Sequence, residues 1–544
     1  MSRARRRRRI RKMAAGIDAR FGTAKFLKRA LHHIFPDHWS FLLGEIALYS
    51  FMILVLTGIF LTFFFKPSLG DVIYHGSYIR LDGVHMSKAY SSVLKISFDV
   101  RGGLLIRQIH HWAALLFVGS IIAHLMRIFF TGAFRRPREL NWMIGVTLFI
   151  LAVVEGFCGY SLPDDLLSGT GMRIAEGIML SIPVVGTYIV YFFFGGTYPG
   201  HIFIERLYIT HVLLIPGLLA ALITAHLMAI WHQEHTEWPG PGKTDDKISG
   251  EPLYPVFMVK TTALFLFTAG ILTLLGTFTQ INPIFLYGPY SPASVSAGSQ
   301  PDFYIGFLEG SLRMMPNIVT NIGGHTFAWD IFIPAVLLPI LFVLALYAYP
   351  WAEEFITGDL RHHHILDRPR NVPARTALGA AVISMGVVLL LAGGDDVISF
   401  YFKIPLYMLV WFFRIGFFVF PVISFYVTRH ACLAMQQRDQ ARLRLGLGKG
   451  VIRQLPGGGY AAISTPVPEN QRAIIEAEPA NRLVAPIPRH IIPLPTPRRV
   501  QAQVLARLNH FYTRYQRETI TDGDGQGRHE NAITAQQEEE EKRS

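Results

Sequence analysis

The chain has 544 residues, of which 51% are hydrophobic and 16% are charged, whereas about a quarter of an average soluble protein is charged. This composition excludes an ordinary soluble enzyme and predicts a membrane protein. The net charge of +13 is interpreted as a product of membrane topology and of contact with anionic membrane lipid. No nucleic-acid-recognition module accompanies the arginine runs, which argues against a nucleic-acid partner.

The first segment, residues 1–40, is basic and contains MSRARRRRRIRK. It is too basic, and the apolar run after it too long, for a cleaved signal peptide. Further basic stretches are RRPR at 135–138, RHHHILDRPR at 361–370 and the arginine-rich tail. With eight spans all four lie on one side of the membrane. The positive-inside rule then predicts a multi-pass cell-membrane protein with both termini in the cytoplasm.

Eight apolar runs reach the roughly 20 residues needed to cross a ~30 Å hydrocarbon core. They lie at about 41–65, 109–131, 142–162, 207–231, 258–278, 329–349, 376–393 and 405–428. A ninth run, 174–194, is interrupted by Glu176, Gly177, Pro183 and Gly186. We predict that it forms short surface helices within 171–195, because broken backbone is tolerated at membrane depth only when it is buried in protein.

The predicted fold is therefore an all-α membrane protein with eight transmembrane helices and cytoplasmic termini. Residues 41–232 are expected to form a four-helix bundle, and 233–428 to add four helices and a long loop, 279–328. Residues 429–544, rich in Pro, Gly, Gln and Arg, are expected to be a partly disordered cytoplasmic tail. No soluble catalytic domain is evident.

The second helix carries three histidines in RQIHHWAALLFVGSIIAHL. At about 100° and 1.5 Å per residue, His110 and His124 share a face to within about 40° and lie about 21 Å apart. His111 lies on nearly the opposite side from His124 and is interpreted as a bystander. On the fourth helix, His211 and His226 share a face to within about 60° and lie about 22 Å apart.

One spanning helix separates these two helices, so they run in the same direction. His110 is then level with His211 near the outer face, and His124 with His226 near the inner face. Two facing neutral imidazoles are the axial ligands of a low-spin b-type haem. The alternative, hydrogen bonding between helices, would suffice for one histidine, but four at matched depths favour two haems.

Glycines with a spacing of fourteen residues support this interpretation, because a haem edge needs backbone close by. They are Gly44 and Gly58 on the first helix and Gly145 and Gly159 on the third. Close helix packing is the alternative. Arg107, Arg127 and Arg206 lie near the histidines and could reach haem propionates, although helix-end arginines also serve as interfacial anchors.

Other polar residues give weaker signals. The two cysteines, Cys158 and Cys432, are too few for an iron–sulfur cluster, and without a CxxCH motif covalent haem is not expected. His362–His364 are interpreted as solvated or lipid-facing. Arg414, near the middle of the eighth helix, is expected to be functional at that depth, with no evident partner.

These features, with AYSSVLKISFDVRGGLLIRQIH, GYSLP, QPDFY and SLRMMPN, resemble cytochrome b of the quinol–cytochrome c oxidoreductases (complex III) over about residues 40–430. GYSLPDDLLSGTG, the long tail and the fifteen-residue histidine spacing are similar to the actinobacterial type. The resemblance implies quinol oxidation at the outer face, with menaquinol favoured. It further implies that one electron passes to a Rieske iron–sulfur partner and the other through a low- and then a high-potential haem b to an inner quinone site. Proton translocation coupled to this transfer is expected as well.

The resemblance also implies partners and an outer quinol site. The partners are a c-type cytochrome subunit, a second copy in a homodimer and a terminal oxidase in a supercomplex. The implied quinol contacts are Pro163, Ser168, Pro301 and Phe303, and the implied catalytic residues are Asp302 and Tyr304. Asp302, which replaces the family's Glu, is the expected proton acceptor, the alternative being a helix N-cap.

The sequence departs from the family pattern at several positions. Asp164 and Asp165 replace Trp-Gly and are expected to add charge at the rim of the outer site. The implied inner quinone contacts are Trp231, His232 and Lys260, of which Trp231 stands where the family has His. Leu42 stands at the position of the cysteine that binds an extra haem in the photosynthetic branch, so that haem is not expected.

Two other functions remain open. A bis-haem membrane anchor, linking a dehydrogenase to the quinone pool, would share the histidine pairs but would not need QPDFY or eight helices. A transporter could use midplane charges and a broken segment, but it would not need stacked histidines.

Overall fold

The computed structural model describes residues 12–513 apart from 14, 17, 21, 247, 295–299, 455, 473–474 and 476–495. Eight helices in this part of the chain are long and apolar enough to cross a membrane, which confirms the predicted number. In chain order these spans are Trp39–Thr62, Gly103–Thr131, Glu139–Ser161, Phe203–Gln233, Leu253–Phe278, Trp329–Thr357, Pro373–Gly393 and Leu406–Leu443.

Each span is built on one long helix, which a short α-helix precedes in two of the spans. They are α3 (Leu42–Thr62), α5 (Gly103–Thr131), α6 (Glu139–Ser161), α9 (Phe203–Ile209) with α10 (Ile215–Gln233), α11 (Met258–Phe278), α14 (Trp329–Phe332) with α15 (Leu338–Thr357), α16 (Pro373–Gly393) and α18 (Leu406–Leu445). The run 174–194 is not among them and forms parts of two short helices, as predicted, although the first of these begins at Leu166.

The remaining helices and strands lie before, between and after the spans. The helices are α2 (Thr23–Leu31), α4 (Lys88–Phe98), α7 (Leu166–Leu180), α8 (Gly186–Phe194), α12 (Ile284–Tyr287), α13 (Phe303–Met314), α17 (Asp395–Phe402) and α20 (Thr496–Thr513). The strands form antiparallel pairs, namely β1 (Ile34–Phe35) with β4 (Glu251–Pro252), β2 (Asp71–Ile73) with β3 (His85–Ser87), β5 (Val319–Ile322) with β6 (His325–Ala328), and β7 (Leu447–Gln454) with β8 (Tyr460–Thr465).

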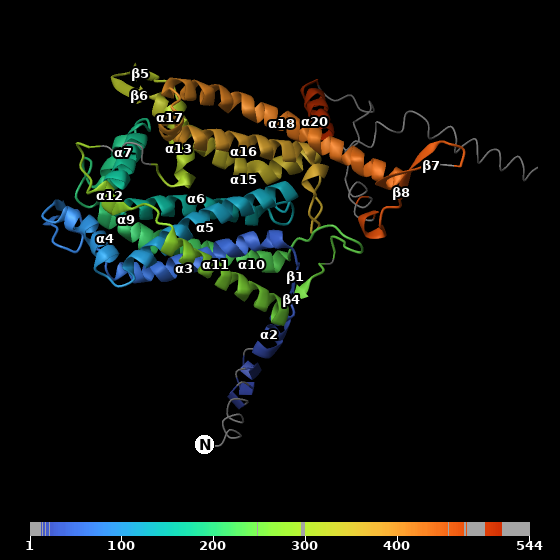
Figure 1. The fold of residues 1–544 in the computed structure, drawn as a ribbon, viewed down its shortest axis with the longest axis horizontal. Helices are drawn as coiled ribbons and strands as arrows, with labels where there is room; N and C mark the ends of the chain where they lie inside the picture. Colours follow the sequence, from blue (N-terminus) through green and yellow to red (C-terminus); the bar gives the residue numbers. More distant parts are fainter. Residues whose placement is uncertain are drawn as a thin grey trace, which may run out of the picture.

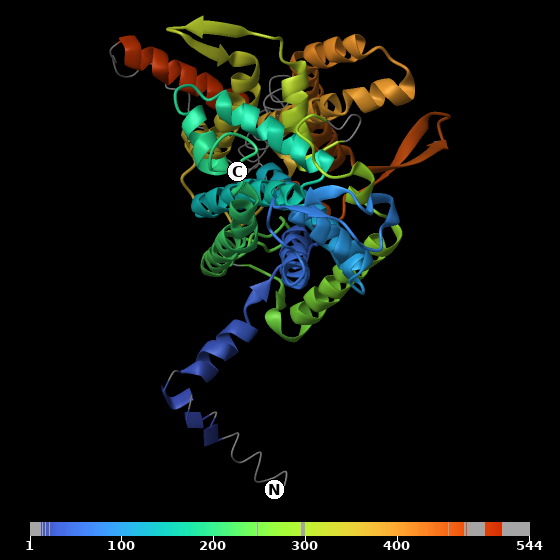
Figure 2. The ribbon, with the colours of Figure 1, turned by 90° about the vertical axis from the view of Figure 1, so that its left-hand side faces the viewer.

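The long helices lie side by side, with α4, α7 and α12 at one end and β1, β4 and α2 at the other (Figure 1). Seen from the first end, α7 crosses the ends of the long helices (Figure 2). A buried core joins α3, α5, α6 and α9–α10 and includes Val118, Ala152 and Leu207. Large apolar side chains remain exposed along the spans, which is the surface that lipid requires.

The basic segments gather at the end that carries β1. The backbone N–H of His363 donates to the carbonyl of Arg136, and that of Glu237 donates to the carbonyl of His364. The indole of Trp238 donates to the ring of His38, which ties the segment before α3 to the same end. We therefore refer to this as the inner end, as the positive-inside rule predicts.

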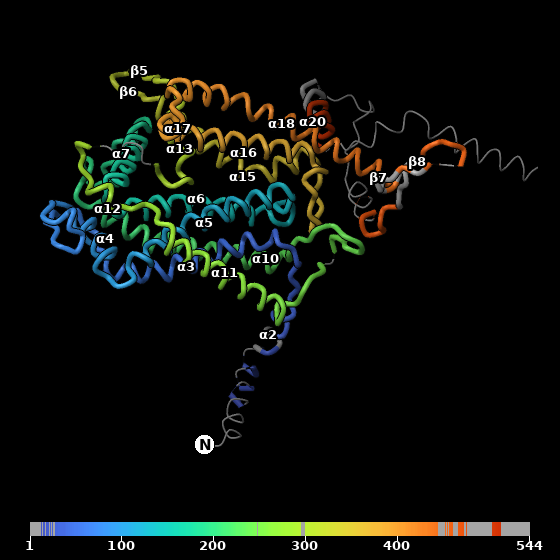
Figure 3. The backbone as a smooth tube through the Cα atoms, viewed as in Figure 1, coloured from blue at the N-terminus to red at the C-terminus, as the bar shows by residue number. Residues whose placement is uncertain are grey.

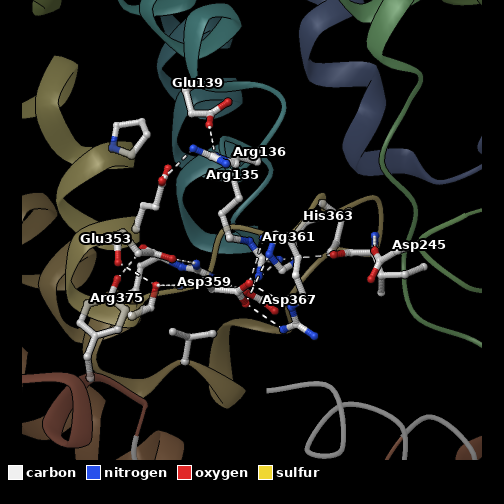
Figure 4. A pocket seen from close by; sticks show the side chains of 17 residues that line it. Arg135, Arg136, Glu139, Asp245, Glu353, Asp359, Arg361, His363, Asp367 and Arg375 are labelled. Atoms are coloured by element: carbon white, nitrogen blue, oxygen red, sulfur yellow. Dashed lines mark hydrogen bonds and ion pairs between the residues drawn. The ribbon is translucent and has the colours of Figure 1, made fainter. Parts of the chain in front are cut away.

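An ionic cluster holds the inner-end loops together (Figure 4). The fully buried Arg375 lies 2.8 Å from Glu353 and 2.6 Å from Asp367, so the buried charge is paired. The interpretation of the histidine run as solvated or lipid-facing is wrong for His363. This residue is only 9% exposed, and its Nε2 lies 3.4 Å from Asp359.

The last span extends further than predicted, because α18 continues to Leu445 instead of ending near 428. Beyond it, the described residues contain the β7–β8 hairpin, which extends past the inner ends of the spans (Figure 3), and α20, which packs on α15 and α16. The hydroxyl of Tyr512 on α20 donates to Glu353 at 2.5 Å, so part of the tail packs on the membrane domain.

The loop helix α13 is fixed against α16 by direct backbone contact. A Cβ on Gly310 would collide with the carbonyl of Leu389, and one on Gly393 would lie 2.5 Å from the carbonyl of Gly306. Arg414, for which the sequence suggested no partner, donates to the carbonyl of Met314 at 2.6 Å. These contacts position the QPDFY segment, which leads into α13.

Candidate functional site

The structure brings the predicted histidine partners together at two levels. The ring centroids of His110 and His211 are 6.2 Å apart, and those of His124 and His226 are 6.5 Å apart. A metal between two imidazoles, with bonds of about 2 Å, requires roughly 6 Å between the ring centroids. Both pairs therefore have the separation that one metal ion between them would need.

A turn of π-helix compensates for the longer spacing on the fourth span. Thr210–Leu214, which contains His211, forms this turn between α9 and α10. Pro216 favours it, because proline has no N–H to donate to the carbonyl of Val212 in a regular α-helix. A π-turn accommodates one additional residue. With this turn, His211 and His226 at a spacing of fifteen residues share a helix face about as closely as two residues fourteen apart in a regular α-helix.

The outer histidines are oriented through their Nδ1 atoms. Nδ1 of His110 lies 2.9 Å from the hydroxyl of Thr57, and Nδ1 of His211 lies 2.9 Å from Oε1 of Glu155. Such contacts fix the ring and leave Nε2 for a metal. The Nδ1 atoms of His124 and His226 are buried and have no hydrogen-bond partner among the described residues.

Each of the four predicted glycines faces one of the four histidines. A Cβ added to Gly44 would lie 3.1 Å from Cε1 of His124, and one added to Gly145 would lie 3.8 Å from Cε1 of His226. At the outer level, a Cβ on Gly58 would lie 3.3 Å from Cε1 of His110, and one on Gly159 would lie 2.5 Å from Cε1 of His211. The glycines therefore make room for the imidazoles. For Gly159, no larger residue fits without displacing the ring.

Two of the three predicted arginines have unpaired buried nitrogens. Nε and Nη2 of both Arg107 and Arg127 are buried with no hydrogen-bond partner among the described residues. Because buried charge without a partner is costly, these guanidinium groups suit an anion such as a propionate. Arg206 instead donates to the carbonyl of Phe192 and lies 5.7 Å over its ring, so the structure gives it a different partner. The imidazole spacing, the glycines and these two arginines fit haem.

A cavity of about 330 Å³ lies beside the outer pair. Its lining is largely apolar and includes His110 and His211 together with Arg107, Pro163, Tyr304, Asp302 and His111. The predicted outer haem site and the predicted quinol loop therefore share one cavity. Of the predicted quinol contacts, Pro163 lines it, whereas Ser168, Pro301 and Phe303 do not.

Asp302 occupies the N-cap position of α13, as the alternative expected, but its side chain makes no capping hydrogen bond. Its carboxylate instead accepts a hydrogen bond from the Tyr304 hydroxyl at 2.8 Å and contacts Nε2 of His111 at 2.9 Å. Burial, together with Asp302, raises the pKa of Tyr304, which keeps this hydroxyl protonated and donating. His111, interpreted as a bystander from the sequence, is therefore part of the outer site.

The expectation that Asp164 and Asp165 add charge at the rim is wrong, because both side chains are buried. Asp165 caps α7 by accepting hydrogen bonds from the backbone of Leu167 and from the hydroxyl of Ser168. Burial raises the pKa of Asp164 to about 7 and that of Asp165 to about 6. Ser168, predicted as a quinol contact, has its hydroxyl engaged in this cap.

The predicted inner-site residues lie at the inner end among aromatic rings. Trp231 stacks on His33 with ring centroids 4.2 Å apart, and Phe35 packs on His235 at 4.6 Å. Lys260 pairs with Asp37 at 3.0 Å and Glu251 at 2.8 Å, while His232 is exposed. His33 and Phe35 precede the first span and were not predicted, because their contacts join segments about 200 residues apart.

Eight spans and facing intramembrane imidazoles that fit haem define a class, the membrane-embedded b-type cytochromes. The family model described as cytochrome b (N-terminal)/b6/petB matches residues 115–289. The cytochrome bc1 complex cytochrome b subunit of Streptomyces coelicolor is 49% identical over 85% of this chain and 84% of that protein. The corresponding subunit of Mycobacterium tuberculosis is 50% identical over 84% and 83%.

A solved structure titled "Hyperthermophilic respiratory Complex III" covers 76% of this chain and 99% of its own, with a TM-score of 0.58. Its 20% sequence identity supports the fold alone. The identity to the curated relatives shows that the chain belongs to the cytochrome b subunits of the cytochrome bc1 complex, quinol–cytochrome c oxidoreductase. It is a multi-pass protein of the cell membrane.

Proposed function

We propose that the chain binds two haems b, one at each histidine level, and carries electrons inward from an outer quinol site to an inner quinone site. The outer haem is held by His110 and His211, and the inner haem by His124 and His226. The observation that carries this proposal is the pairing of the four imidazoles at metal-binding separation, with a glycine against each ring.

When bound, haem b supplies one-electron transfer without an open site for oxygen. The protein orients the imidazoles through Thr57 and Glu155 and offers Arg107 and Arg127 to the propionates. The apolar lining of the surrounding bundle excludes water, which strengthens these interactions. The levels are about 21 Å apart.

At the outer site, Asp302 is the proposed acceptor of a quinol proton. Its carboxylate lies on the shared cavity between a hydroxyl donor, Tyr304, and an imidazole, His111. Quinol oxidation releases two protons, and the carboxylate and imidazole offer two adjacent places for them. Asp302 and the outer histidine pair line the same cavity. A single quinol in this cavity could therefore give its proton to Asp302 and its electron to the outer haem.

Inward transfer must overcome the membrane potential. A full crossing costs about 2.3 kcal/mol per 100 mV, and ~21 Å of a ~30 Å core is roughly two-thirds of that. The outer haem is therefore the low-potential one and the inner haem the high-potential one. At the inner end, Trp231, His232 and Lys260 are the proposed quinone contacts, and the stacked His33 adds an imidazole to them.

The substrate we propose is menaquinol, with a Rieske iron–sulfur protein taking the first electron and a c-type cytochrome receiving it. A homodimer, a supercomplex with a terminal oxidase and coupled proton translocation belong to the same proposal. It rests on the relatives, which are named as subunits of a cytochrome bc1 complex.

Spectroscopy and turnover of the purified complex test the proposal. Quinol should reduce both b haems and the c-type cytochrome, and removal of the Rieske subunit should abolish reduction of the cytochrome. A bis-haem anchor would exchange electrons with quinone without Rieske dependence. A transporter would show no b-type spectrum. Either result would overturn the proposal.

A further inference from the structure

The four proposed haem ligands differ in what their Nδ1 atoms contact. Nδ1 of His211 lies 2.9 Å from a carboxylate oxygen of Glu155 and 3.2 Å from the carbonyl of the same residue. Nδ1 of His110 contacts the neutral hydroxyl of Thr57. The Nδ1 atoms of the inner pair contact no carboxylate among the described residues. The outer level thus has a carboxylate contact that the inner level lacks.

Glu155 is placed for this contact by α6. It lies four residues, about one helical turn, before Gly159, so both residues face the same imidazole. Its carboxylate is within a membrane span and lines the outer cavity, and its Oε2 is buried with no partner among the described residues. An acidic side chain at membrane depth is costly and is normally retained for a function.

The contact acts on the ligand and through it on the metal. An imidazole that binds iron through Nε2 carries its proton on Nδ1, so Nδ1–H donates to the Glu155 carboxylate. A carboxylate acceptor increases the basicity of the ligating nitrogen and adds negative charge near the iron. Both effects favour the ferric state, and hydrogen bonding of this kind is one of the means by which a protein lowers a haem potential.

We propose that Glu155 is a positioning residue that holds the potential of the outer haem below that of the inner haem and so gives electron transfer its inward direction. This rests on the proposed function, because it requires haem at the outer level. Glu155 acts through its contact with Nδ1 of His211. The difference in potential between the two haems therefore depends on one side chain at the outer level.

Glu155→Gln in the purified complex is the direct test, because the amide keeps the shape of the side chain and removes its charge. Potentiometric titration should show a higher midpoint potential for the outer haem and an unchanged one for the inner haem. A tenfold change in its reduction equilibrium corresponds to about 59 mV for a one-electron couple. The electron paramagnetic resonance signal of the ferric outer haem should shift as well.

Two further variants complete the test. Glu155→Asp keeps the charge one methylene further away, and its outer potential should lie between those of the wild type and Glu155→Gln. Glu309→Gln is the matched control, because Glu309 is a partly buried outer-side carboxylate that pairs with Arg313, not with a histidine. It should leave both potentials unchanged.

The failures of the two proposals are distinguishable. Two haems with an unchanged outer potential in Glu155→Gln would overturn the role of Glu155 and leave the proposed function intact. Loss of the outer haem from both Glu155 variants would show a purely structural role and would also overturn it. Absence of b-type haem from the wild-type complex would refute the proposed function itself.

Discussion

Gly159→Ala should displace His211 and weaken binding of the outer haem. A Cβ at this position would lie 2.5 Å from Cε1 of the ring, well inside van der Waals contact. The ring cannot rotate away freely, since Glu155 holds its Nδ1. Overpacking of this kind costs about 1–3 kcal/mol, which corresponds to roughly a 5- to 150-fold loss of haem affinity.

The assay is haem content and the reduced-minus-oxidised spectrum of the purified complex, with the outer component resolved by its potential. Gly270→Ala in α11 is the matched control, because nothing lies within 4 Å of the Cβ that it would add and the residue is not part of the haem site. It should keep both haems. Equal retention of haem by the two variants would contradict the assignment of Gly159 to the outer site.

Three further predictions concern residues outside the haem ligands. Asp302→Asn should lower the rate of quinol oxidation about a hundredfold or more, which is the usual contribution of a general base, while the haem spectrum stays unchanged. A variant with the full wild-type rate would remove Asp302 from the mechanism. The pKa of Asp165 is raised from 3.8 to about 6. The native state therefore binds the proton more tightly, and the fold loses up to about 3 kcal/mol as the pH rises from 4 to 6. Asp165→Asn, which keeps an N-cap residue, should reduce the pH dependence of the thermal unfolding temperature. An unchanged pH dependence would argue against a raised pKa of Asp165 in the folded state. Tyr512→Phe removes a hydrogen bond to the Glu353 carboxylate, worth about 1.5–3 kcal/mol. It should speed proteolysis within α20, and wild-type protease resistance would show that this contact does not hold the helix.

The spans and the histidine pairs could be predicted because both depend on local periodicity. Hydrophobic length gives the eight spans, and the helical repeat alone selects His124 over His111 as the partner of His110 on a shared face. The interruption by Pro183 and its neighbouring glycines likewise identifies 174–194 as a pair of short helices.

The contacts that complete the site are long-range and could not be read from local patterns. His111 meets Asp302 across 191 residues. Its position next to His110 indicated only that it faces elsewhere, not which loop it contacts. The π-turn at His211 was not predicted, although the additional residue in the histidine spacing and Pro216 were signals for it. Glu155 also gave a signal, an acidic residue in an apolar run, and could have been singled out for that reason.

Buried capping residues were misinterpreted because charge in a sequence suggests exposure. From the sequence, Asp165 was interpreted as a charge at the rim of the outer site and Ser168 as a quinol contact. In the structure the two residues form a capping box at the start of α7. The tail was judged by composition, which does not reveal that Tyr512 has a buried carboxylate to bind.

The most direct test is the haem content of four single alanine variants, at His110, His211, His124 and His226, in the purified complex. Each variant should lose the haem of its own level and retain the other, so that the first two lack the low-potential component and the last two the high-potential one. Retention of both haems by any of the four would contradict ligation at two membrane levels.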